Sequence, residues 1–261
     1  MFGDEVIWGY DENDETYYSS HRITHEGHNT GFTDYGPPTG RKVNYGAVAD
    51  CVVKENQVIE EWLVRDGLTL VHQLGLDLHD TARRMAKIEA DSGLRDMVVQ
   101  GEIERLQGQL PPKKMPPKEG DKFDAEDFVR RSFHEIWNWR MLNKVNDYYA
   151  ENAVCESASM RRMYGHGDFK AYILSLLGPF PDMMISVDHF CVIGDEKAGY
   201  RAATRWTMQG THTGPGVYGK ATGKRINIIG VTQQLVQNER ITREWTLFDE
   251  FALLKQLYTP D

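Results

Sequence analysis

Hydrophobic and polar positions in the second half of the chain change from a helical to an alternating period. Apolar side chains recur at helical spacing over residues 124–141, where Asp124 can cap the first turn, and again over Asp168–Leu177. Beyond these helices the pattern is that of strands joined by short turns and one Gly-rich crossing. The predicted strands are Ala153–Ala158, Met183–Ile193, Gly199–Gln209, Arg225–Val236 and Ile241–Leu254. Because short turns make neighbouring strands antiparallel, this order predicts an α+β fold with helices over one face of a curved sheet.

The chain also repeats part of itself at a constant offset of 183 residues. Residues 21–77 lie over residues 204–260 without a gap, so that Trp62 meets Trp245. A gapless match that aligns two tryptophans is far from what chance gives, and the period is too long for a solenoid. The repeat therefore predicts an internal duplication into two related domains.

The two copies are unequal in what precedes the matched strands. The second copy carries residues 123–184 ahead of them, and the first copy has almost nothing there. We therefore expect a truncated sheet half at residues 1–77 and a complete domain at residues 123–261. Residues 78–122 are expected to form a helical connector that ends in a stiff Pro- and Lys-rich linker.

A curved sheet that lacks its helices would expose a large apolar face. In the first copy that face is expected to include Trp62, Val64, Leu68 and Leu70. The segment Leu78–Leu110 reads as two charged amphipathic helices. We expect this segment, or a partner chain, to cover the face.

Composition narrows the class of protein. Hydrophobic residues make up 40% and charged residues 26% of the chain, as in ordinary globular proteins. The balance of 30 basic against 39 acidic residues disfavours a general nucleic-acid or anionic-membrane binder. Three cysteines do not make a disulfide scaffold, and no apolar run is long enough to span a membrane. With no signal-peptide pattern at its start, the chain is expected to be a soluble cytoplasmic protein.

The matched segments carry a recognisable set of motifs. They are Gly210-x-His212-Thr213-Gly214, Thr222-Gly223-Lys224, Asn238-Glu239-Arg240-Ile241, Glu244-Trp245-x-x-x-Asp249 and Gln256-Leu257. This set resembles the SnoaL-like polyketide cyclase family, within the nuclear-transport-factor-2-like superfamily. The resemblance covers residues 123–258, and its sheet half recurs in residues 2–77. It implies a cone-shaped α+β barrel, in which a bent sheet wraps over helices around a pocket, and it implies a homodimer.

The resemblance also implies a chemistry. In the cyclases the aspartate of the Trp-x-x-x-Asp motif is the acid/base of an intramolecular aldol ring closure that needs no metal or cofactor. That position is Asp249 here, and Asp66 in the first copy. The cyclases also place histidines near this acid, where the present chain has Leu247 and Leu235. The superfamily hosts isomerases, hydrolases, dehydratases and non-catalytic binders, so the fold alone does not choose among them.

Two interpretations of Asp249 stay open at the level of residues. If it lies on the last strand among apolar side chains, burial raises its pKa into a range that suits proton abstraction next to a carbonyl. If it forms a buried ion pair with Arg205, its pKa falls instead and the base is lost. An open cavity beside Asp249 would favour the first interpretation.

The other candidates have a structural interpretation beside the functional one. Trp245 is expected to fill the cone, with Glu244 pointing outward, although stacking on a substrate is the alternative. Asn227 is expected to point inward, to a ligand carbonyl or to the backbone. His166 stands at the pocket mouth or caps a helix, and Tyr148 reaches the pocket or belongs to the core.

Metal and phosphate sites are not expected. His28 and His212 lie in the Gly-rich crossings without a further ligand at suitable spacing, and the glycines there do not lead from a strand into a helix. The leading hypothesis is a cofactor-independent enzyme of the cyclase or isomerase kind for a small hydrophobic or polyketide-like ligand. Its base would be Asp249, in a pocket shaped by Asn227, Trp245, Arg205, His166 and Tyr148. The alternative is a ligand-binding or assembly module of the same fold without catalysis.

Overall fold

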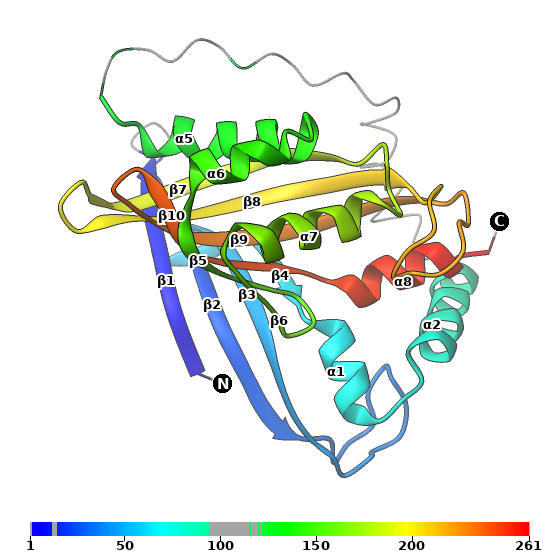
Figure 1. The fold of residues 1–261 in the computed structure, drawn as a ribbon. Coiled ribbons are helices and arrows are strands. Elements are labelled where there is room, and N and C mark those ends of the chain that lie inside the picture. Colours follow the sequence, from blue (N-terminus) through cyan, green and yellow to red (C-terminus); the bar gives the residue numbers. More distant parts are fainter. Residues whose placement is uncertain (1, 12–14, 94–114, 116–119, 121, 261) are drawn as a thin grey trace.

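The computed structural model describes residues 2–11, 15–93, 115, 120 and 122–260. Two sheets, with the strand orders β1-β2-β3-β4 and β6-β5-β10-β9-β8-β7, make up the protein together with their helices (Figure 1). The α+β class with a curved sheet wrapped over helices is confirmed. The larger sheet is open, with β6 and β7 at its edges, and does not close into a barrel.

The N-terminal sheet, which we call the half copy together with the helix that follows it, is antiparallel throughout. Its elements are β1 (Phe2–Asp11), β2 (Thr16–His28), β3 (Lys42–Lys54), β4 (Gln57–Arg65) and α1 (Gly67–Leu74). Helix α2 (Leu78–Ser92) follows and packs against the last helix of the chain.

The second unit, residues 123–260, is called the complete copy. Its helices are α5 (Ala125–Ser132), a π-helical segment (Phe133–Asn138), a 3-10 turn (Leu142–Lys144), α6 (Val145–Tyr148), α7 (Gly165–Leu177) and α8 (Glu250–Tyr258). Its strands are β5 (Tyr149–Ser157), β6 (Arg161–Tyr164), β7 (Met184–Asp195), β8 (Gly199–Thr211), β9 (Arg225–Gln237) and β10 (Arg240–Phe248). Strands β7 to β10 form the expected antiparallel meander, while β5 pairs in parallel with β10.

The predicted first helix is only partly continuous. Asp124 caps α5 as expected, because its side chain accepts a hydrogen bond from the backbone N–H of Asp127 at 3.0 Å. The chain then widens into the π-helical segment before it reaches Asn138. The amide of Asn138 bonds both the N–H and the C=O of Ile185 at 2.8 Å, which ties this segment to the start of β7. The prediction of a single helix to residue 141 is therefore wrong.

The predicted last strand is also wrong beyond Phe248. Asp249 ends the strand and caps α8, since its Oδ1 accepts hydrogen bonds from the backbone N–H groups of Phe251 at 2.9 Å and Ala252 at 3.0 Å. The half copy repeats this turn, because Asp66 accepts from the N–H of Thr69 at 3.1 Å and caps α1. Both acids of the Trp-x-x-x-Asp motif are therefore helix caps.

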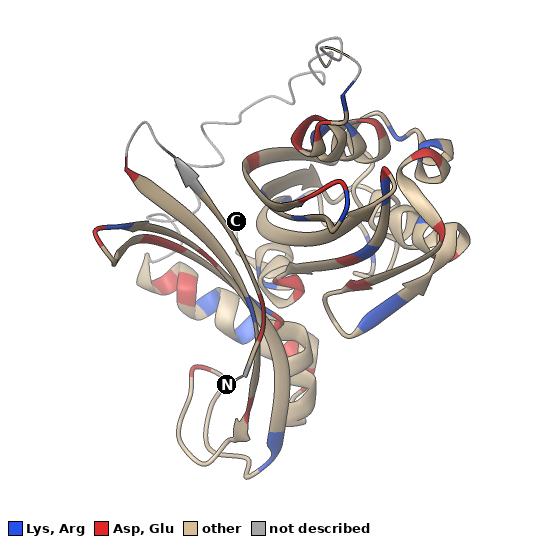
Figure 2. Ribbon diagram, turned by 90° about the vertical axis from the view of Figure 1, so that its left-hand side faces the viewer, with Lys and Arg blue, Asp and Glu red and all other residues tan. Residues whose placement is uncertain are grey.

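The sheets pack face to face, with the inner face of the complete copy turned toward its own helices and main core. The half copy lies along the outer face of the larger sheet (Figure 2). There, Val48 and Val64 of the half copy pack against Val231 and Leu247. Two stacking pairs cross this interface in a symmetrical manner. Arg22 lies over Trp245 at 4.0 Å to the ring centroid, and Arg205 lies over Trp62 at 3.4 Å.

This packing decides what covers the half copy. The face that carries Trp62 and Val64 lies against the sheet of the complete copy, and Leu68 packs against the main core. For Trp62 and Val64, the expectation that Leu78–Leu110 or a partner chain covers them is therefore wrong. Leu68 shares its core with Leu78 and Ala82 of α2, as expected in part. Helix α2 packs on α8, and residues 94–110 lie outside the described residues.

Candidate functional site

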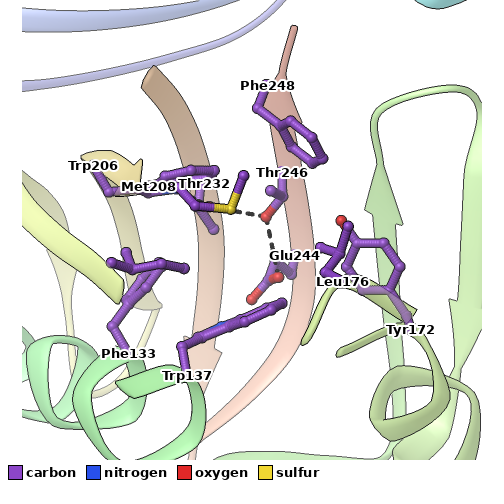
Figure 3. A pocket seen from close by; sticks show the side chains of 11 residues that line it. Phe133, Trp137, Tyr172, Leu176, Trp206, Met208, Thr232, Glu244, Thr246 and Phe248 are labelled. Carbon is purple, nitrogen blue, oxygen red and sulfur yellow. Dashed lines mark hydrogen bonds between the residues drawn. The ribbon is translucent and has the colours of Figure 1, made fainter. Parts of the chain in front are cut away.

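A cavity lies inside the cone, between the inner face of the larger sheet and the helices (Figure 3). Its walls come from Phe133, Trp137, Tyr172, Leu176, Ile185, Trp206, Met208, Thr232, Glu244, Thr246 and Phe248. Between these side chains the centre of a water molecule can move through about 20 Å³. That is room for roughly one water molecule, so a larger ligand must displace a wall side chain. Met208 is flexible and unbranched and is therefore the wall best able to move.

Glu244, on β10, is the one acidic side chain in the cavity wall. It is 5% exposed, and its Oε2 accepts hydrogen bonds from the Tyr149 hydroxyl at 2.6 Å and from Gln234 Nε2 at 2.7 Å. Burial raises the pKa of Glu244 above its ordinary value, and these hydrogen bonds lower it in part. The wall contains no arginine or lysine to compensate the charge. Glu244 is thus a buried acid held in place by neutral donors.

The second oxygen of Glu244 ends a chain of hydroxyl groups. Trp206 Nε1 donates to Thr232 Oγ1 at 2.9 Å, and the hydroxyls of Thr232 and Thr246 lie 2.8 Å apart. Thr246 Oγ1 in turn donates to Glu244 Oε1 at 3.1 Å. Since an indole N–H only donates and a carboxylate only accepts, the protons of the chain all point toward Glu244. The chain orients Oε1 at the cavity surface (Figure 3).

A β-bulge turns Glu244 into the cone. Near the hairpin, Arg240 faces Gln237 and Ile241 faces Val236, but Arg243 faces Leu235, so Thr242 has no partner of its own. One unpaired residue exchanges the two faces of the strand beyond it. Glu244 is brought inward by this shift. The expectation that Trp245 fills the cone while Glu244 points outward is therefore wrong.

The half copy has the same bulge at the equivalent place. Val53 faces Val58 and Val52 faces Glu60, so that Ile59 is left unpaired. Beyond it, Glu61 lies opposite Cys51, as Glu244 lies opposite Gln234 in the complete copy. The described part of the half copy carries no helices over this face, so the enclosed cavity belongs to the complete copy.

Asp249 lies away from the cavity, at the junction of the two copies. A Cβ placed on Gly67 would come within 2.6 Å of Asp249 Oδ1, so the two helix caps pack closely and position 67 requires glycine. Burial raises the pKa of Asp249 from 3.8 to about 6, the charge of Asp66 raises it further, and the helix N–H groups lower it. Asp249 does not pair with Arg205. Its raised pKa agrees with the first interpretation, but Asp249 is not among the residues that line the cavity in the cone.

Arg205 and Trp245 also belong to the junction. Arg205 Nη1 lies 2.8 Å from Asp50 Oδ2, and Asp50 is 2% exposed. Burial raises the pKa of Asp50 to about 6, against the lowering by the guanidinium. Trp245 stacks under Arg22 on the outer face of the sheet. Neither candidate lines the cavity in the cone.

The remaining candidates lie around the cone without entering its cavity. The backbone N–H of Asn227 donates to Gln256 Oε1 at 2.7 Å, and its neighbours Ile226 and Ile228 face the core. The expectation that Asn227 points inward is therefore wrong. His166 lies in the first turn of α7, with Nε2 2.9 Å from the carbonyl oxygen of Tyr149. The Tyr148 hydroxyl donates to Glu135 at 3.0 Å.

Sequence reasoning missed Glu244 and its partners Tyr149, Gln234 and Thr246. The signal was present in the alternation along β8, which puts Trp206 and Met208 on one face of the strand. Following that face across the sheet leads from Trp206 through Thr232 to Thr246, and thus to Glu244 two residues away. The unpaired Thr242 could not be read from the sequence.

A metal-binding cluster and a membrane-spanning helix are both absent from the described residues. They contain no group of three or more His, Cys, Asp or Glu side chains arranged to hold a metal ion. Among the same residues, no helix combines the length and the apolar character that a membrane span requires.

Comparison with known proteins matches the complete copy to one family. The sequence profile of the SnoaL-like polyketide cyclases matches residues 127–257. A protein from Jannaschia sp. CCS1 assigned as a SnoaL-like polyketide cyclase is 17% identical and covers 54% of this chain and 100% of its own, with a TM-score of 0.48. TsrD from Streptomyces laurentii is 19% identical over 53% of this chain and 100% of its own, with a TM-score of 0.45. A search of curated proteins found no match.

Proposed function

This chain belongs to the SnoaL-like polyketide cyclase family, and on that premise we propose that its cone binds a small, largely apolar carbonyl compound and moves a proton on it. Glu244 is the acid/base of the proposal. The observation that carries it is the position of this carboxyl group, buried and without a cation, in the wall of the cavity. No metal or cofactor takes part, since a carboxylate can move such a proton alone.

The geometry supports a specific division of labour within the carboxyl group. Oε2 is held by Tyr149 and Gln234, while Oε1 accepts a single hydrogen bond from Thr246. Oε1 therefore keeps a lone pair for a proton taken from the carbon next to the substrate carbonyl. The raised pKa of Glu244 is closer to neutral pH than the ordinary value. The same carboxyl group can therefore take up the proton and return it at another carbon or to an oxygen.

The aromatic walls support an apolar, flat substrate. Trp137 and Phe133 from the π-helical segment face Trp206 and Phe248 from the sheet across the cavity (Figure 3). The Tyr172 hydroxyl is less available to a substrate, because it lies within hydrogen-bond distance of Ser157 Oγ, at 2.6 Å. A polyketide-like ring system matches walls of this kind.

The test is proton exchange, which needs no knowledge of the natural substrate. 1-Tetralone in D₂O, followed by ¹H NMR, reports exchange at the carbon next to its carbonyl. The protein is expected to accelerate this exchange, and Glu244→Gln is expected to remove about 100-fold or more of the acceleration. Asp249→Asn is the matched control and should retain it. An Asp249→Asn protein without activity beside an active Glu244→Gln protein would overturn the assignment.

The non-catalytic alternative keeps support from one observation. Glu244 accepts three hydrogen bonds and is satisfied without a ligand, as a structural buried acid would be. A pure binding module would show quenching of the cavity tryptophans, Trp137 and Trp206, on addition of 1-tetralone, with no exchange above the buffer rate. The same pair of measurements therefore separates the two functions.

A homodimer remains part of the proposal. The outer face of the larger sheet already carries the half copy, through the two crossed Arg–Trp pairs and the Arg205–Asp50 ion pair. A second chain would therefore have to bind elsewhere. Light scattering coupled to size exclusion tests this prediction, and a mass of 29.9 kDa in solution would contradict it.

A further inference from the structure

A second cavity lies between the two copies, on the other side of β10 from the cone. The half copy contributes Asp4, Arg22, Ile23, Thr24, Gly46, Ala47, Val48 and Asp66, and the complete copy contributes Glu156, Ser157, Met160, Trp245, Thr246 and Leu247. The centre of a water molecule can move through about 210 Å³ of this cavity. This volume is roughly ten times that of the cavity in the cone, and the wall contains more polar side chains.

Arg22 is the cation in this wall. Its Nε is buried and has no hydrogen-bond partner. Burial lowers the pKa of Arg22, while the charges of Asp4, Glu5 and Glu156 raise it. The unpartnered Nε–H is costly, because a buried donor loses water and gains no hydrogen bond in return. The guanidinium is nevertheless fixed in place by its stacking on Trp245.

Comparison of the two copies shows which partner Arg22 lacks. Arg205 occupies the equivalent position in the complete copy and pairs with Asp50 at 2.8 Å. The residue that stands in the complete copy where the half copy has Asp50 is Gln233, and its amide is turned to the backbone oxygen and hydroxyl of Ser20. Arg22 therefore lacks the carboxylate that its counterpart has, and it lines the cavity between the copies.

Three carboxylates of the wall are already engaged, but two keep accepting capacity. Asp66 accepts from Thr69 and from the N–H of Ser159 at 2.9 Å. Asp4 Oδ2 accepts from the Thr24 hydroxyl at 2.8 Å, and Glu156 Oε1 pairs with Arg162 at 2.7 Å. A carboxylate offers about four lone-pair sites, so Asp4 and Glu156 can each accept from a ligand.

We propose that this cavity binds a small amino-acid-like zwitterion, whose carboxylate pairs with Arg22 and whose ammonium group lies by Asp4 and Glu156. A plain anion would meet the wall carboxylates, and a plain cation would leave Arg22 unpaired. A ligand that carries both charges satisfies both ends of the cavity. The site lies on the other side of β10 from the cone, with Thr246 common to the two walls, and its proposed ligand does not depend on proton transfer at Glu244.

Isothermal titration calorimetry on the full chain tests the proposal with a series of probes. Glycine, β-alanine and 4-aminobutyrate carry both charges at increasing separation, while acetate and methylammonium each carry one. At least one zwitterion is expected to bind at least tenfold more tightly than either single-charge probe. Equal affinity for acetate and the zwitterions, or no binding of any zwitterion, would overturn the proposal.

Variants then locate the site. Arg22→Gln is expected to weaken binding of the zwitterion at least tenfold, whereas Arg83→Gln, which removes an exposed arginine paired with Asp80 on α2, should leave it unchanged. Gly46→Val adds a side chain to the cavity wall at a position where a Cβ meets no atom within 4 Å. It is expected to weaken binding as well, and it serves if Arg22→Gln does not fold. Unchanged binding in folded Arg22→Gln or Gly46→Val protein would contradict the assignment.

Discussion

Replacement of Asp249 by asparagine separates its role as a helix cap from a role in chemistry. The cap should survive, because asparagine is as good a capping residue as aspartate and its Oδ1 can accept the same two N–H groups, those of Phe251 and Ala252. What changes is the charge. Asp249 lies half-buried beside the second cap, Asp66, at the junction of the two copies.

The magnitude follows from the pKa. Burial raises the pKa of Asp249 from 3.8 to about 6, a difference of about two units, and each unit corresponds to about 1.4 kcal/mol. Because the pKa is raised in the folded state, the folded protein holds this proton more strongly than the unfolded chain does. The resulting stability is complete below pH 3.8 and is lost as the pH rises to about 6. Ionisation of Asp249 therefore costs about 3 kcal/mol at neutral pH, as an upper estimate.

The assay is urea unfolding at a series of pH values from 4 to 8, for the wild-type protein and Asp249→Asn. The two free energies of unfolding should be similar at the acid end, and the variant should become the more stable protein by up to about 3 kcal/mol at neutral pH. Asp77→Asn, at the exposed cap of α2, is the control for loss of a capping carboxylate without burial. A variant that is less stable than the wild type at pH 7.5, or a difference that does not vary with pH, would refute the reasoning.

Further predictions concern the junction and the cone. Arg205→Met leaves Asp50 buried without its partner and should lower the free energy of unfolding by about 3–5 kcal/mol in urea. Gly230→Ala places a Cβ 2.2 Å from Cζ2 of Trp206, so it should cost about 1–3 kcal/mol and shift the tryptophan emission; unchanged emission would contradict the packing. Thr246→Val removes a donor to the cavity acid, whose pKa should rise further, so the pH of half-maximal tetralone exchange should move upward rather than stay or fall.

Much of the fold could be predicted from the sequence, because local signals and the repeat agreed. The hairpin turns set the antiparallel order of β7 to β10, and Asp124 marked the start of α5. The repeat carried over to structure element by element: β2 spans Thr16–His28 and β8 spans Gly199–Thr211, the same strand at the constant offset. The duplication as an evolutionary event and the domain boundaries stay predictions.

The site could not be predicted because two nonlocal effects act on β10. The outer face of the sheet is buried by the half copy, so the apolar Trp245 and Leu247 lie there, while Glu244 and Thr246 face the cone. Hydrophobic alternation along this strand therefore points to the wrong face as the inner one. The bulge at Thr242 then reverses the faces of Glu244 and Trp245. The helix after Asp249 could have been predicted, because Leu253, Leu254 and Leu257 lie at helical spacing after a capping acid.

Infrared difference spectroscopy of the wild-type protein against Glu244→Gln gives the most direct test of the central claim, that Glu244 is the buried acid of the cone. The C=O stretch of a protonated carboxyl group distinguishes it from the ionised form, and the difference between the two proteins isolates Glu244. The band should persist to a pH above the ordinary glutamate pKa of 4.5 and should shift when 1-tetralone enters the cavity. A Glu244 that ionises at its ordinary pKa, with a band that does not respond to the ligand, would contradict the account.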